Sequence, residues 1–158
     1  MAALQASSFG WALACCNGDR EEAQDVLQTA YLKVLEGRAR FDGGSSFKTW
    51  LFAVIRRTAA ERRRSRWLRS LALARWWAGP TEAAAADPER AAGAAEASQR
   101  LRESLAVLPA RQREMLHLVF YQDLTVEGAA GVAGISVGSA RTHYHRGKAR
   151  LRAMLGER

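Results

Sequence analysis

The chain has 158 residues, which is enough for one domain or two small ones. It carries 24 Lys and Arg against 16 Asp and Glu, a formal net charge of +8, and all but three of the basic residues are Arg. Because guanidinium groups suit phosphate and guanine edges, this composition favours a nucleic-acid partner. No run of 18 apolar residues exists, so we expect no stable membrane insertion, and the N-terminus lacks the basic start of a secretory signal.

The two cysteines, Cys15 and Cys16, are adjacent and do not have the spacing of a disulfide framework or a zinc site. We therefore expect a protein of the reducing cytoplasm in which both cysteines are packing residues. A redox-sensing pair is the alternative interpretation of the same two residues.

Charge is distributed in blocks along the chain. Residues 56–75 hold eight Arg and one Glu, a net charge of +7, and residues 141–152 have a net charge of +5. Residues 19–36 and 81–96 each have a net charge of −3. Two basic blocks, each accompanied by an acidic stretch, indicate two separate nucleic-acid contacts.

A segment of low complexity separates the two basic blocks. From Gly79 to Gly93 the chain reads GPTEAAAADPERAAG, with two Pro and no aromatic or large aliphatic residue. Such a segment cannot bury a core. We therefore predict a first domain over residues 1–78, a flexible acidic linker over 79–96 and a second domain over 97–158.

The first predicted helix follows Asp19, which forms a variant of the capping box with Glu22. An apolar stripe at helical spacing gives this helix a length of about fifteen residues, and Gly37 lies just past its end. The stripe consists of Ala23, Val26, Leu27, Ala30, Tyr31, Val34 and Leu35.

A turn-rich loop over residues 41–46 leads into the next helix, which Ser46 is placed to cap. We expect Phe47 and Trp50 to pack in the core, and Phe41 in the loop to be the better candidate for contact with an unpaired base. The helix continues into the Arg block, where Arg on successive turns forms a row suited to phosphates. Its predicted core stripe consists of Phe47, Trp50, Leu51, Val54, Ile55 and Thr58.

The second domain also reads as helical, with a short leucine stripe that Pro109 ends. Thr125 and Ser136 are placed to cap two later helices, and the turn at Gly134 between them is typical of a helix-turn-helix motif. The last helix runs to about Leu155. The predicted apolar positions are Leu101, Leu105 and Leu108, then Met115, Leu116, Val119 and Phe120 around His117, with small residues Ala130, Gly134 and Ala140 where the motif's helices cross.

In a helix-turn-helix motif the second helix enters the major groove with its early side chains at the base edges. Arg141, Thr142, His145 and Arg146 occupy the exposed side of the predicted helix, and the basic residues after them suit phosphate. An ordinary helical hairpin with a solvated basic face is the alternative interpretation.

No catalytic or metal-binding pattern is present: there is no glycine-rich phosphate loop, and the three His do not have metal-ligand spacing. We expect no cofactor. The stretch over residues 66–77, with three Trp among Arg, predicts a helix end packed on the first domain, with a membrane-surface helix as the alternative.

Two parts of the sequence resemble the sigma-70 family. Residues 25–33 and 40–52 resemble region 2, and residues 105–114 and 124–152 resemble region 4, with only a linker between them. The chain therefore resembles an extracytoplasmic-function, or group 4, sigma factor. The resemblance implies an all-α protein of two small helical domains that binds RNA polymerase core and directs it to promoters. A stand-alone helix-turn-helix regulator is the alternative.

The resemblance also implies partners and site residues. Core polymerase would be bound through its β′ clamp helices and its β flap, and an anti-sigma factor would be a further partner. The residues implied for the polymerase are Asp25, Leu27, Gln28, Tyr31 and Leu32. Those implied for the −10 element are Arg40, Phe41, Ser45, Ser46, Lys48, Arg56, Arg57, Arg62, Arg63 and Arg64. Those implied for the −35 element are Ser136, Ser139, Arg141, Thr142, His143, His145 and Arg146.

Three features depart from the family pattern. The segment before Gly18 is short, so we expect the first helix of region 2 to be trimmed. Thr29 stands where the family usually has Glu in the polymerase-binding helix, and Arg57 stands where many members have Asn. The last two differences are expected to alter core affinity and promoter preference.

Overall fold

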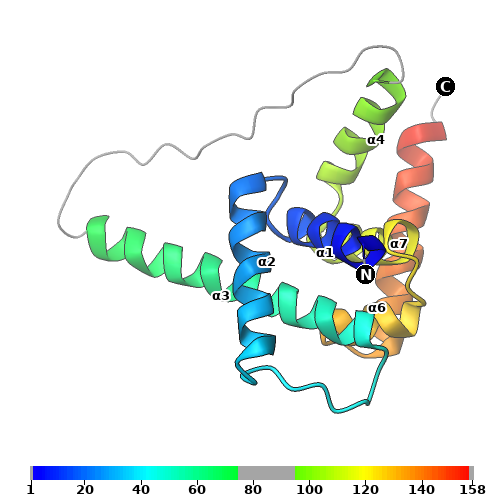
Figure 1. The fold of residues 1–158 in the computed structure, drawn as a ribbon. Helices are drawn as coiled ribbons and strands as arrows, with labels where there is room; N and C mark the ends of the chain where they lie inside the picture. The colour runs from blue at the N-terminus through cyan, green and yellow to red at the C-terminus, as the bar shows by residue number, and fades with distance from the viewer. Residues whose placement is uncertain (1, 75–94, 157–158) are drawn as a thin grey trace. The chain divides into compact units, whose positions relative to one another are not determined.

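The computed structural model describes residues 2–74 and 95–156, and all the regular structure within these two stretches is helical (Figure 1). The all-α fold of two domains expected from the sequence is thus confirmed. The chain divides into two compact units, one in its N-terminal and one in its C-terminal half. Most of the predicted linker, together with Trp76 and Trp77, lies outside the described residues.

The first unit begins with α1 (Ala2–Cys15), a helix that the sequence reasoning missed. It packs against both other helices of the unit, and Trp11, 2% exposed, donates its indole N–H to the Phe52 carbonyl over 3.0 Å. The chain leaves the helix through Gly18, whose φ of +88° suits glycine. The short N-terminal segment therefore supplies part of the core, although a trimmed helix was expected there.

Helix α2 (Arg20–Leu35) begins as predicted, because Asp19 Oδ1 accepts a hydrogen bond of 2.9 Å from the Glu22 amide. Its buried residues are Ala23, Val26 and Ala30. The predicted stripe is wrong at its end, since Leu35 is 82% exposed. Steps of four residues turn a helix by about 40°, so the positions 27, 31 and 35 move progressively off the buried face.

Helix α3 (Phe47–Ala74) starts at the Ser46 cap, whose Oγ accepts a hydrogen bond of 3.1 Å from the Thr49 amide. The stripe from Leu51 to Thr58 is buried as predicted, and the buried Phe52 was not foreseen. Phe47 was expected in the core, but it is 45% exposed because it lies in the first turn beside the loop.

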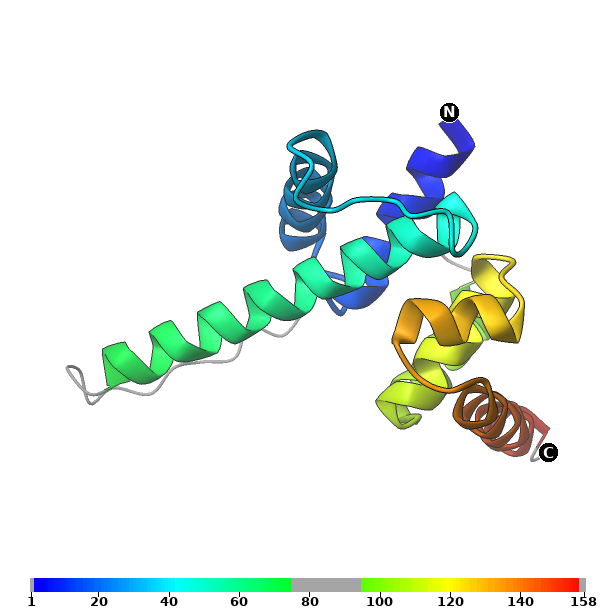
Figure 2. The ribbon, with the colours of Figure 1, turned by 90° about the horizontal axis from the view of Figure 1, so that it is seen from below.

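The second half of α3 extends beyond α1 and α2 as a single projecting helix (Figures 1 and 2). Every described side chain over residues 63–71 is exposed, including Trp67, at 60%, and Leu68, at 50%. For the described side chains of residues 66–71 the prediction that this helix end packs on the first domain is therefore wrong, apart from the ion pair between Arg66 and Glu22 of α2. We call residues 63–71 the α3 arm.

The second unit contains α4 (Ala95–Val107), α5 (Ala110–Leu116) and the π-helical turn η1 (His117–Tyr121), then α6 (Val126–Ala133) and α7 (Val137–Gly156). Thr125 caps α6 and Ser136 caps α7 through amide hydrogen bonds of 3.0 and 3.2 Å, as predicted. Gly134, in the left-handed conformation with φ +65°, ends α6, so α6 and α7 form the expected helix-turn-helix motif (Figure 2).

Two expectations for the second unit need correction. Gly134 was expected to be the small residue that lets the helices of the motif cross closely, but a Cβ there would meet no atom within 4 Å. Glycine is needed at this position for the left-handed backbone conformation instead. The glycine that permits close helix approach is instead Gly147 of α7, where a Cβ would lie 3.2 Å from Gln112 Cβ on α5. The wider turn of η1 shifts the helical register, so Leu118 is buried while Phe120 is 55% exposed.

Across the described stretches, we find no helix with both the length and the apolar character needed to cross a bilayer.

Candidate nucleic-acid interface

The exposed side of α7 carries the side chains predicted for base contact. Arg141, Thr142, His145 and Arg146 are exposed, whereas His143 is half-buried. Ser136 and Ser139 are hydrogen-bonded to each other, Oγ to Oγ over 2.9 Å, at the cap of the helix. The early turns of α7 thus present polar and basic groups from a fixed helix start, as a groove-reading helix requires.

Arg141 has a partner that the sequence reasoning did not foresee. Its Nη2 donates a hydrogen bond of 2.8 Å to Glu127 Oε1 in the first turn of α6, and both side chains are more than half exposed. This hydrogen bond lowers the pKa of the Glu127 carboxyl below its ordinary value of 4.5. Positions 127 and 141 lie on different helices, so no local pattern in the sequence identifies the pair.

In the first unit, an aromatic cluster joins the loop to the start of α3. The rings of Phe41, Phe47 and Trp50 lie with centroids 5.3 to 5.6 Å apart, and Phe41 is 43% exposed. The Trp50 indole donates a hydrogen bond of 3.1 Å to the Arg40 carbonyl. Trp50 is half-buried in this cluster, so the expected core position holds only in part.

The loop itself is held by short-range hydrogen bonds. The Gly44 amide donates to Asp42 Oδ1 over 2.9 Å, and Gly43 has a φ of +78°. Ser45 and Ser46 are exposed beside the aromatic cluster, and Lys48 lies over the Phe52 ring at 5.5 Å. The loop therefore offers aromatic, hydroxyl and cationic groups on one short segment.

The Arg block of α3 is divided between two faces, where the sequence suggested a single row. Arg62 donates to Asp25 of α2 over 2.7 Å, and Arg66 pairs with Glu22 over 3.0 Å. Arg57, Arg63 and Arg64 are exposed, and Arg56 is half-buried. Part of the acidic charge of α2 is thus neutralised inside the unit by Arg residues of α3.

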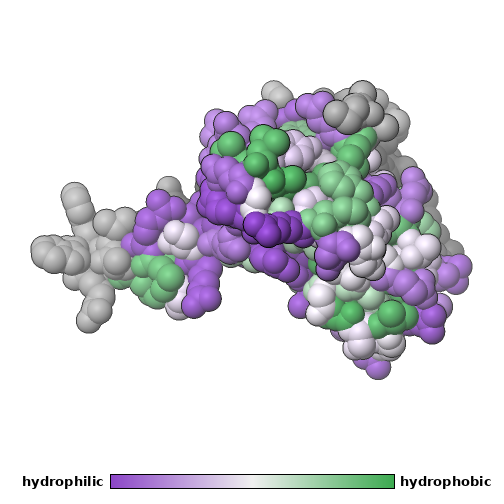
Figure 3. Space-filling model, turned by 60° about the horizontal axis from the view of Figure 1, so that its bottom comes forward, coloured by the Kyte–Doolittle hydropathy of each residue, from purple (hydrophilic) through white to green (hydrophobic). Residues whose placement is uncertain are grey.

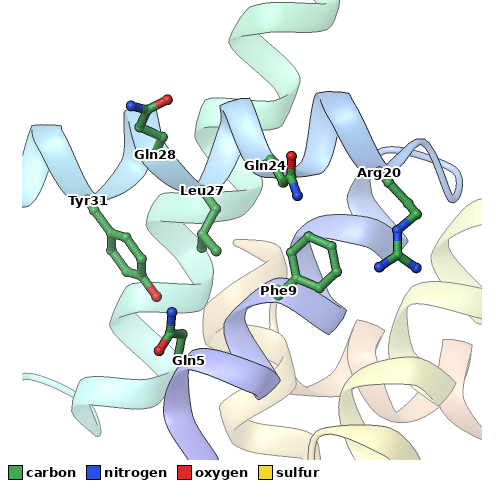
Figure 4. Close-up of a pocket in the computed structure, with 7 residues that line it drawn as sticks. All are labelled: Gln5, Phe9, Arg20, Gln24, Leu27, Gln28 and Tyr31. Carbon is green, nitrogen blue, oxygen red and sulfur yellow. The ribbon is translucent and has the colours of Figure 1, made fainter. Parts of the chain in front are cut away.

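Three of the five α2 residues predicted for polymerase binding, Leu27, Gln28 and Tyr31, line a shallow groove between α1 and α2 (Figure 4). Leu32 lies outside the groove and is 45% exposed, and Asp25 is paired with Arg62. Phe9 of α1, beneath the Arg20 guanidinium, was missed because no sequence pattern marked α1. The groove has a volume of about 490 Å³ and is lined by Gln5, Phe9, Arg20, Gln24, Leu27, Gln28 and Tyr31.

Burial shifts the pKa values of two residues, one in each unit. Burial lowers the pKa of His117 from 6.5 to about 4, and the ring stacks on Tyr121 with centroids 5.4 Å apart. Burial raises the pKa of the Cys16 thiol to about 11, and the two adjacent cysteines are not joined in a disulfide. Within the described stretches, no three His, Cys, Asp or Glu residues are grouped to hold a metal ion.

Comparison with known proteins assigns both units. The sequence model of Sigma-70 region 2 matches residues 5–69, and that of Sigma-70, region 4 matches residues 98–151. The RNA polymerase sigma factor CarQ of Myxococcus xanthus is 31% identical over 136 residues, which cover 85% of this chain and 75% of CarQ. The chain belongs to the sigma-70 family. It is an extracytoplasmic-function (ECF) RNA polymerase sigma factor.

Further relatives agree with this assignment. The ECF sigma factor SigW of Bacillus subtilis is 26% identical over 87% of this chain and 78% of its own length. In the co-crystal structure of RpoE with the anti-sigma factor NepR from Bartonella quintana, the sigma factor is similar with a TM-score of 0.71 and 25% identity. That match covers 98% of this chain and 92% of RpoE.

As an ECF sigma factor, the protein directs transcription initiation by RNA polymerase and is a non-enzymatic subunit. Helices α1 to α3 belong to region 2, and the helix-turn-helix α6–α7 belongs to region 4. The presence of both regions in order sets aside the alternative of a stand-alone regulator.

Proposed function

We propose that this sigma factor reads the −35 element with α7 and the −10 element with the 40–48 loop and α3. The observation that carries the proposal is the row of exposed side chains that follows the left-handed turn at Gly134. Arg and His at those positions can donate to base edges in the major groove, and Ser and Thr can bind bases or phosphate. The proposed −35 residues are Ser136, Ser139, Arg141, Thr142, His143, His145 and Arg146.

For the −10 element, the proposal assigns an unpaired base to the aromatic cluster around Phe41, where ring faces are partly exposed. The cations of the loop and α3 hold the adjoining backbone. The proposed −10 residues are Arg40, Phe41, Ser45, Ser46, Lys48, Arg56, Arg57, Arg62, Arg63 and Arg64.

Sigma factors bind RNA polymerase core, and we assign that contact to α2. The β′ clamp helices would dock over the groove and the exposed Leu32, through Asp25, Leu27, Gln28, Tyr31 and Leu32, and the β flap would contact region 4. The partly apolar lining and the amide side chains of the groove suit a helix that brings apolar and polar groups together.

An anti-sigma factor is the second proposed partner, since the similar RpoE was solved in complex with one. Such a partner would cover the polymerase-binding surface.

The proposal also covers localisation and domain boundaries. Because the protein acts together with RNA polymerase, we place it in the cytoplasm. The proposed domain boundaries are 1–78 and 97–158, with an acidic linker over 79–96.

The polymerase contact is tested by co-purification of the full chain with core polymerase. Leu32→Asp places a charge in the proposed interface and is expected to lower the bound fraction by about tenfold or more. Leu35→Asp is the matched control, because Leu35 is 82% exposed on the same helix and lies outside the proposed set. Equal binding by both variants would contradict the assignment.

The −35 contact is tested with the holoenzyme. Arg141→Ala is expected to remove most of the difference in affinity between an intact −35 element and one with a changed base pair, on the order of 1–3 kcal/mol. Arg152→Ala, near the end of α7, is the control and is expected to weaken both promoters alike. Unchanged discrimination by Arg141→Ala would contradict the proposed role of α7.

A further inference from the structure

The outward side of α3 combines arginines with exposed apolar side chains in one stripe. Residues 57, 60, 64, 67 and 71 recur at steps of three and four, so they lie on one side of the helix. All five are exposed, with Trp67 at 60% and Leu71 at 44%. We call Arg57, Ala60, Arg64, Trp67 and Leu71 the α3 stripe.

The α3 stripe lies away from the rest of the unit. Arg62 and Arg66, which bind Asp25 and Glu22 of α2, mark the inward side of the helix. Position 64 lies about 160° around the helix from position 62, so the stripe is turned nearly opposite to α2. The arm projects beyond the other helices, and its surface shows green apolar atoms bordered by purple polar ones (Figure 3).

We propose that Trp67 is a base-stacking site for single-stranded DNA, on the same track as Arg57 and Arg64. An exposed indole offers a large ring face that stacks on any base, while guanidinium groups one and three turns earlier hold the phosphates. About 15 Å of helix separates position 57 from position 67, enough for a short run of nucleotides. The inference rests on the proposed function, because it extends the −10 contact of α3 to a residue beyond the Arg run.

The composition of the stripe favours single-stranded DNA over a lipid surface or an apolar protein helix as the occupant. The large apolar side chains exposed at this end of the helix are Trp67, Leu68 and Leu71, which lie within about one turn, and the positions before them on the stripe are Arg57, Ala60 and Arg64. A membrane-surface helix or a docking helix needs a continuous apolar face. Glu61 is the one acidic residue of α3, and its carboxylate is bound by Lys33.

The test measures binding of the full chain to oligodeoxythymidylate of about 12 nucleotides, by fluorescence anisotropy at low salt. Trp67→Ala is expected to weaken binding about tenfold, the loss typical of one stacked base. Trp67→Phe keeps a ring and should recover most of the affinity. Leu68→Ala is the matched control, because Leu68 is 50% exposed and lies about 100° around the helix from Trp67.

Salt dependence separates stacking from charge. Trp67→Ala should leave the slope of log affinity against log salt concentration unchanged. Arg64→Ala should make this slope less steep, by about the amount that one phosphate contact contributes. Photocrosslinking with 5-iodouracil in the same oligonucleotide should label the Trp67 peptide. Equal affinity of wild type and Trp67→Ala, or equal losses in Trp67→Ala and Leu68→Ala, would overturn the proposal.

Two further outcomes are decisive. If Trp67→Ala loses binding to phosphatidylglycerol vesicles and keeps its oligonucleotide affinity, the stripe is a lipid surface and the proposal fails. If the proposed promoter-recognition function is wrong, a different result is expected. The wild-type chain with core polymerase would then give no promoter-dependent transcript. A wild type that initiates, together with a Trp67→Ala variant that binds the oligonucleotide normally, rejects the Trp67 site alone.

Discussion

Arg62 of α3 donates a hydrogen bond of 2.7 Å to Asp25 of α2, although 37 residues separate them in the sequence. Arg62 belongs to the proposed −10 contact, and Asp25 belongs to the proposed polymerase contact. The same guanidinium also reaches Thr29 Oγ1 over 3.4 Å. A polymerase that engages Asp25 would therefore release Arg62 for DNA.

Asp25→Asn tests this coupling. Removal of the carboxylate charge frees Arg62 for phosphate, so the full chain should bind single-stranded DNA several-fold more tightly at low salt. Its free energy of unfolding should change by less than about 1 kcal/mol, since the pair is partly exposed. Glu36→Gln is the matched control, because Glu36 also pairs with an Arg and the change removes the same charge. Equal gains in both variants would point to net charge alone.

The Glu127–Arg141 pair leads to a second prediction. Glu127 holds one nitrogen of the guanidinium, and Glu127→Gln weakens that restraint while removing a negative charge beside the DNA. Affinity of the holoenzyme for unrelated DNA should rise, and the ratio of affinities for intact and altered −35 elements should fall about threefold to tenfold. Competition binding at fixed salt measures both. A ratio that stays constant would show that the pair does not position Arg141.

His117 gives the stability of region 4 a pH dependence. Its folded pKa of about 4 lies below the ordinary 6.5, so between these values the unfolded chain binds more protons than the folded chain. Stability is therefore greatest above pH 6.5 and falls as the pH drops towards 4, by on the order of 1–3 kcal/mol. Urea unfolding across this window should show the loss. His117→Phe should flatten it and His145→Gln should not; a His117 proton signal in NMR that titrates near pH 6.5 would contradict the prediction.

Gly147 provides a packing test with a matched control on the same helix. Gly147→Ala brings a Cβ to 3.3 Å from the Gln112 carbonyl oxygen and from Leu116 Cδ1, so strain should outweigh the gain in helix propensity. We expect a loss of about 1 kcal/mol in the free energy of unfolding. Gly138→Ala, where a Cβ meets no atom within 4 Å, should be neutral or stabilising. Thermal unfolding of both variants measures the difference, and a higher Tm for Gly147→Ala would refute the close approach.

Local signals in the sequence predicted the helix starts and the helix-turn-helix motif. The caps at Asp19, Ser46, Thr125 and Ser136 were identified correctly because each makes a hydrogen bond within three residues, and such bonds depend on neighbouring residue types alone. Helical spacing predicted the buried face of α2 from Ala23 to Ala30 and that of α3 from Leu51 to Thr58, but not the first turn of α3, where Phe47 is exposed.

Features that leave no regular helical pattern in the sequence, or that depend on distant parts of the chain, were missed. Helix α1 has no charged residue and no polar face opposite an apolar one, so its sequence pattern did not predict a helix. The π turn displaced Phe120 from the predicted face, because periodicity arguments assume one constant pitch. The pairing of Arg62 with Asp25 depends on how α2 and α3 pack, and the role of Gly147 depends on α5.

The central claim is tested most directly by run-off transcription with RNA polymerase core and the purified full chain on genomic promoter fragments. We predict transcripts that start at defined sites only when the chain is added, and that are lost on substitution of either the −10 or the −35 element. Transcription that is independent of the chain, or dependent on it but insensitive to both elements, would contradict the account.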